Sequence, residues 1–62
     1  MTTKYYVIFG YHGTGWEAED YFEDYSEAKR CLGEYRMIGT YAMQTRYVRD
    51  NRDPLNCRYR YN

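Results

Sequence analysis

His12 is the single histidine of this 62-residue chain and lies in a glycine-containing turn, where an exposed imidazole could act as a general base. No residue near it in the sequence resembles a nucleophile or an orienting carboxylate, and a catalytic triad needs all three groups together. Gly13-Thr14-Gly15 lacks the Gly-Lys-Ser/Thr continuation of a phosphate loop and precedes an expected strand rather than a helix. We therefore expect no enzyme, with His12 a solvated turn residue.

The two cysteines, Cys31 and Cys57, lie 26 positions apart. Metal sites need clustered Cys, His or carboxylate ligands, so we expect no metal and no cofactor. The apolar run 5–9 is too short for a secretion signal or a membrane span. A reducing cytoplasm is the expected location, without membrane contact, and both cysteines are expected to be free thiols there. Cys31 is expected to be a small core residue.

Ten tyrosines are more rings than a core of this size can hold, which points to a binding surface. Residues 1–30 hold six acids and three bases, a net charge of −3, whereas residues 31–62 hold three acids and six bases, a net charge of +3. In the basic half, arginines are interleaved with tyrosines, a mixture that protein interfaces favour. The expected partner-binding residues are Trp16, Tyr21, Arg46, Tyr47, Arg58, Tyr59, Arg60 and Tyr61.

Three other kinds of partner stay open. Arginines interleaved with rings also hold single-stranded nucleic acid, although the sequence pI near 6.5 is well below the basic footprint of such domains. The acidic half could dock on a basic site of another protein. A nucleotide sequestered between two subunits is the remaining alternative.

Three segments have the pattern of strands. The run 4–10 is β-branched and aromatic without polar alternation after Lys4, which predicts a central strand covered on both faces. Residues 16–24 alternate imperfectly and are expected to form a hairpin with that strand. Residues 41–49 alternate and predict a third strand, antiparallel beside the first. Residues 51–62 are expected to form a C-terminal tail or a fourth, edge strand.

One segment has the pattern of a helix. Ser26 is the expected N-cap, and the helix is expected to extend over about residues 27–37. Its apolar stripe recurs at helical spacing and consists of Ala28, Cys31, Leu32 and Tyr35. The predicted fold class is thus α+β: one small β-β-α-β domain over residues 1–50, with an antiparallel or mixed three-stranded sheet and the helix on one face. The other sheet face needs a cover, which predicts a homodimer or a higher homo-oligomer.

The stretches YYVIFGYHGTGWE (5–17) and SEAKRCLGEYR (26–36) resemble small accessory proteins encoded by phages and prophages. The shared features are a Tyr-rich strand, a glycine-containing turn running into Gly-Trp-Glu, a Glu-Ala…Leu-x-Glu-Tyr-Arg helix and an Arg-bearing strand. The resemblance covers about residues 4–49, and the tail 52–62 departs from it. It implies no catalytic residues and a role in the host cytoplasm during infection. We expect a non-enzymatic inhibitor that occupies the surface of a host protein, including a protein of a bacterial defence system.

Overall fold

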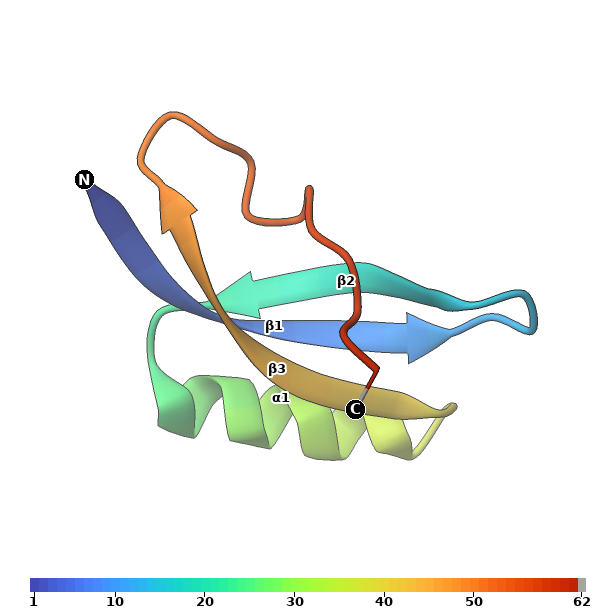
Figure 1. Cartoon of the computed structure of the whole chain (residues 1–62). Helices are drawn as coiled ribbons and strands as arrows, with labels where there is room; N and C mark the ends of the chain where they lie inside the picture. The colour runs from blue at the N-terminus through green and yellow to red at the C-terminus, as the bar shows by residue number, and fades with distance from the viewer. Residues whose placement is uncertain (62) are drawn as a thin grey trace.

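The structure, a computed structural model, describes residues 1–61. The elements are β1 (Thr2–Tyr11), β2 (Trp16–Phe22), α1 (Tyr25–Arg36) and β3 (Tyr41–Arg49). The strands form one sheet in the order β2-β1-β3, and both neighbours are antiparallel to β1 (Figure 1). The predicted β-β-α-β fold with a central first strand is confirmed. In the described part of the chain, no helix is long and apolar enough to cross a membrane.

The middle of β1 is the core of the molecule, because it is covered on both faces. Val7, Ile8 and Phe9 have an exposed fraction of 0%. Successive side chains of a strand point to opposite faces, so Ile8 faces the helix α1, whereas Val7 and Phe9 point to the opposite face of the sheet. In α1, Ala28 and Leu32 are buried one helical turn apart. This double cover explains why the segment carries no polar alternation.

The β1–β2 hairpin contains a bulge that the sequence pattern does not reveal. Ile8 pairs with Asp20, whereas Phe9 pairs with Ala18, so Glu19 is an extra residue in β2. The turn at its tip is closed by a hydrogen bond from the His12 amide to the Gly15 carbonyl, 3.1 Å long. The imperfect alternation of this strand follows from the bulge, because the facing side changes at the extra residue.

The helix begins at Tyr25, earlier than predicted, and its N-cap is Asp24 rather than Ser26. The Asp24 carboxylate accepts a hydrogen bond of 2.9 Å from the backbone N–H of Glu27, which satisfies a donor of the first turn. The earlier start places the Tyr25 ring edge-on against Tyr6 of β1, with centroids 5.3 Å apart. This aromatic contact across the layers favours the cap at Asp24.

Residues 50–61 adopt turns and irregular backbone, and they cross the sheet on the face away from α1 (Figure 1). Two hydrogen-bonded turns reverse the chain after β3: Arg52 N–H to the Arg49 carbonyl at 2.9 Å, and Asn56 N–H to the Asp53 carbonyl at 3.0 Å. The tail then lies over Phe9 through Tyr59. The sheet face assigned to a second subunit is therefore covered by the chain itself, and that reason for self-association is removed.

Candidate partner-binding surface

The tail is anchored by an aromatic stack. The rings of Trp16 in β2 and Tyr59 in the tail lie parallel, with centroids 4.4 Å apart and 13° between their planes. Tyr59 also meets Phe9 edge-on at 5.5 Å. Trp16 and Tyr59 are both expected to contact a partner, but part of the surface of each ring packs inside the fold and stabilises it.

Two polar side chains of β3 hold the backbone of the tail. The Gln44 amide donates to the Arg60 carbonyl at 2.9 Å and accepts from the Arg60 N–H at 3.0 Å, as a neighbouring strand would. Arg46 donates to the Arg58 carbonyl at 2.9 Å and to the Gln44 side-chain oxygen. Its guanidinium carbon lies 5.3 Å from the centroid of the Phe9 ring. Arg46 is therefore a positioning residue for the tail.

Burial lowers the pKa of the Arg46 guanidinium; the charge of Arg60 lowers it further, and Cys57 acts in the opposite direction. The hydrogen bonds to backbone carbonyls compensate part of the loss of water around this charge.

The side chains that remain free surround this anchor. Tyr61 has an exposed fraction of 72% and meets Tyr59 edge-on at 5.1 Å. Arg58 and Arg60 are exposed, since only their backbone groups are engaged by β3. We call this surface the aromatic tail face; it consists of the Trp16–Tyr59 stack and the exposed side chains of Tyr11, Tyr21, Arg58, Arg60 and Tyr61.

The structure gathers six of the eight predicted residues on or beneath the tail, places Tyr21 elsewhere on the same sheet face, and places Tyr47 on the opposite face. Tyr6 faces the helix, so its neighbour Tyr5 points to the opposite face of the sheet, where the tail lies. The Tyr21 ring meets Tyr5 edge-on at 5.3 Å and therefore lies on that face as well. Tyr47 pairs with Lys4 and lies on the helix side of the sheet, with an exposed fraction of 70%. Tyr47 therefore does not belong to the surface around the tail, although Tyr47 and Arg46 both line a pocket at the end of β3.

Sequence reasoning missed Gln44 and Tyr11. Tyr11 meets Trp16 edge-on at 5.4 Å and extends the aromatic row across the hairpin. Gln44 could have been noticed as a polar residue between Ala42 and Arg46 on one face of its strand. Its role could not, because that role depends on where the tail runs.

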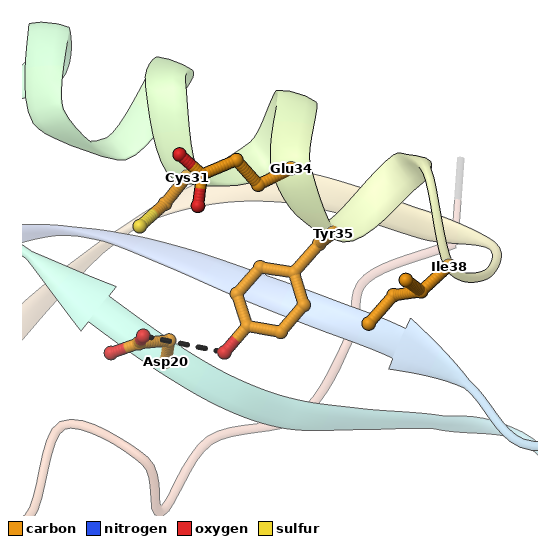
Figure 2. A pocket seen from close by; sticks show the side chains of 5 residues that line it. All are labelled: Asp20, Cys31, Glu34, Tyr35 and Ile38. Carbon is orange, nitrogen blue, oxygen red and sulfur yellow. Dashed lines mark hydrogen bonds between the residues drawn. The ribbon is translucent and has the colours of Figure 1, made fainter.

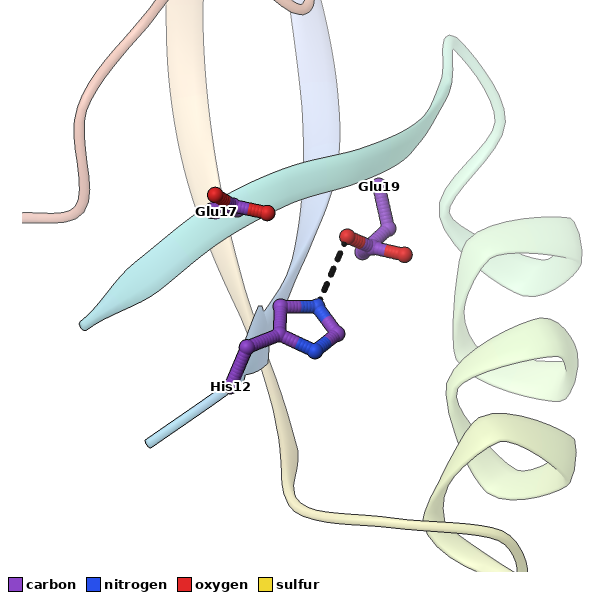
Figure 3. Close-up of side chains that lie close together, drawn as sticks. All are labelled: His12, Glu17 and Glu19. Carbon is purple, nitrogen blue, oxygen red and sulfur yellow. Dashed lines mark hydrogen bonds and ion pairs between the residues drawn. The ribbon is translucent and has the colours of Figure 1, made fainter. Parts of the chain in front are cut away.

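A second cluster lies at the hairpin. His12 Nε2 is 2.9 Å from a carboxylate oxygen of Glu19, and ligand atoms of His12, Glu17 and Glu19 lie within 4.8 Å of one another (Figure 3). His12 thus has the orienting carboxylate that its sequence neighbourhood lacks, because the bulge brings Glu19 back to it. A histidine and two carboxylates could hold a divalent cation. All three lie on the surface, where acidic groups are common without a bound cation.

A pocket of about 230 Å³ separates β2 from α1 and is lined by Asp20, Cys31, Glu34, Tyr35 and Ile38 (Figure 2). The Tyr35 hydroxyl donates to the Asp20 carboxylate at 3.4 Å. Burial raises the pKa of Tyr35, and the charge of Asp20 and this hydrogen bond raise it further. Cys31, expected to be a core residue, is half-buried at the wall of this pocket.

No known protein family, curated protein or solved structure matches this chain. Neither its fold nor its surface can therefore be assigned a role by comparison. The resemblance to phage accessory proteins stays a prediction from the two motif stretches. Function has to be argued from the surface itself.

Proposed function

We propose that the protein is a non-enzymatic binding module that docks on another protein through the aromatic tail face. One observation carries the proposal: both sides of β1 are already covered by the chain, yet exposed tyrosines and arginines still gather beside the Trp16–Tyr59 stack. These rings are not needed to fill the core. Tyrosine, tryptophan and arginine are the residues that dominate binding energy at protein interfaces.

The geometry favours a protein over single-stranded nucleic acid. Bases need open ring faces on which to stack, whereas Trp16 and Tyr59 stack on each other. The chain is neutral overall, whereas domains that bind nucleic acid usually carry a net basic charge. Arg58 and Arg60 border an aromatic centre, and this arrangement suits a partner with an apolar patch bordered by carboxylates.

The biological role within this proposal is that of an inhibitor. The phage-like motifs support a host protein as the partner, including a protein of a bacterial defence system. A chain of this size would act by occupying the partner's surface rather than by modifying it. The carboxylates of the hairpin and of the helix start are not part of the aromatic tail face and could steer the encounter through their charge.

Affinity capture from bacterial lysate tests the proposal with two matched triple variants. Arg58→Ala, Arg60→Ala and Tyr61→Ala together remove two charges and one exposed tyrosine from the aromatic tail face. The control variant combines Lys29→Ala, Arg30→Ala and Tyr47→Ala, which remove two charges from the helix and one exposed tyrosine from the helix side of the sheet. We expect the first variant to lose the partner, because a true anchor costs about 2 kcal/mol or more on truncation, and the second to retain it.

Equal capture by both variants would place the contact elsewhere and overturn the proposed surface. Filter binding of single-stranded oligonucleotides at low and moderate salt separates the nucleic-acid alternative. Phosphate contacts would show as a steep loss of affinity with salt. We expect no binding to the oligonucleotides at either concentration.

A further inference from the structure

Three arginines line a second pocket, at the end of β3. It is an open depression of about 250 Å³ between the end of β3 and the turns that follow it. We call it the arginine pocket; it is lined by Arg46, Tyr47, Val48, Arg49, Arg52, Asp53, Asn56 and Cys57. None of the exposed side chains of the aromatic tail face lines it, so it is a separate site.

The two turns after β3 shape the pocket. The hydrogen bond from the Arg52 N–H to the Arg49 carbonyl, 2.9 Å long, closes the first turn, and both residues line the pocket. The Asp53 carboxylate accepts from the Leu55 N–H at 3.0 Å and stabilises the second turn. The Cys57 thiol donates to the Pro54 carbonyl at 3.4 Å and fixes the far wall.

The charges of this pocket are not balanced by the protein. Among residues 1–61 the one ion pair joins His12 and Glu19, far from these arginines in the fold. The guanidinium groups of Arg49 and Arg52 make no hydrogen bond to any described residue. Three arginines and one aspartate give the lining a net charge of +2.

The Cys57 thiol of the lining does not change this balance at neutral pH. Burial raises the pKa of the Cys57 thiol, Arg46 lowers it and Asp53 raises it. The thiol is therefore uncharged at neutral pH. The excess of positive charge is left for a ligand.

We propose that the arginine pocket binds the dianionic phosphate group of a small phosphate monoester or of inorganic phosphate. A phosphate near pH 8 carries about two negative charges, which matches the net charge of the lining. Guanidinium groups present paired donors that bind phosphate oxygens in a bidentate manner. The pocket is smaller than the roughly 300–1,000 Å³ of drug-sized sites, which favours a compact anion.

An NMR titration of the full chain tests this, with inorganic phosphate and a nucleoside 5′-monophosphate as separate probes at pH 8 and constant ionic strength. We expect saturable amide shifts confined to residues 46–57. Arg49→Gln with Arg52→Gln should weaken binding at least tenfold. Lys29→Gln with Arg30→Gln removes the same charge from the outer face of α1 and should change it less than twofold.

The two probes distinguish the source of the phosphate. Equal affinities identify the phosphate group alone as the ligand, and a nucleotide that binds at least tenfold more tightly identifies a nucleoside phosphate. Shifts that do not saturate, or equal weakening in both double variants, would overturn the proposal. Tighter binding of a single-stranded oligonucleotide, with a steep salt dependence, would overturn it as well.

Discussion

Gly10 of β1 is surrounded by side chains of β3 and of the β1–β2 hairpin. A Cβ atom there would lie 2.7 Å from Cε1 of Tyr41, 3.1 Å from Nε2 of His12 and 3.2 Å from Cγ of Glu19. These neighbours are themselves fixed, Tyr41 against Tyr35 with centroids 4.7 Å apart and His12 against Glu19. The space is therefore reserved for a residue without a side chain.

We expect Gly10→Ala to lower the free energy of unfolding by about 1–3 kcal/mol, because a well-packed site has no room for an added methyl group. Gly33→Ala is the matched control: nothing lies within 4 Å of its Cβ position, and alanine is the better helix former by about 1 kcal/mol. Urea denaturation of both variants measures the difference. A Gly10→Ala protein as stable as wild type would show that the strands do not approach this closely.

Tyr35 makes the stability sensitive to alkaline pH. Its pKa is raised above the ordinary 10.0, chiefly by burial and then by Asp20, so the folded protein holds this proton more firmly than the unfolded chain does. The contribution is fully present below the unfolded pKa and is lost as the pH rises through the folded value. We expect Tyr35→Phe to lose less stability than wild type between about pH 9 and pH 11. Parallel pH curves of the melting temperature would contradict this.

The tail behaves as a third layer of the fold, although it has no regular secondary structure. Gln44 supplies it with a donor and an acceptor, and Tyr59 packs it on Phe9 and Trp16. A chain this short has little core of its own to spare. The tail therefore contributes to stability as well as to the proposed interface.

We expect Tyr59→Ala to destabilise the protein by about 2 kcal/mol, since a half-buried ring and its aromatic partners are lost. Trp16, the one tryptophan, reports the change directly: its emission should shift to the red as water reaches the ring. Tyr61→Ala, at an exposed ring, should leave both readouts near wild type. An unchanged Trp16 spectrum in Tyr59→Ala would show that the tail does not lie on β2.

Local pattern predicts the elements better than their junctions. The alternation of residues 41–49 gives β3 with its observed bounds, and the unbroken apolar run predicts a central β1. The sequence predicts the helix cap at Ser26, whereas Asp24 caps the helix, and the earlier start goes with a contact between Tyr25 and Tyr6 of β1. The Glu19 bulge and the path of the tail depend on contacts between distant segments, which no local pattern reveals.

At the scale of the whole molecule, charge and rings are divided between regions. The acidic residues lie mostly in β2 and at the start of α1, whereas Arg58 and Arg60 lie on the tail. The sequence predicts a binding surface in the basic half, whereas the aromatic tail face also contains Tyr11, Trp16 and Tyr21 of the acidic half and does not contain Tyr47. The tail takes the place assigned to a second subunit, so self-association is left to a direct measurement of mass in solution.

Site-specific photo-crosslinking tests the proposed docking surface most directly. A benzophenone amino acid replaces Tyr61, on the aromatic tail face, or Arg30, on the outer face of α1 as the control. After irradiation in bacterial lysate, we predict a discrete protein adduct from position 61 that is absent from position 30 and that excess unlabelled wild-type protein suppresses. No adduct from position 61, or the same adduct from both positions, would contradict the assignment of the aromatic tail face as the binding surface.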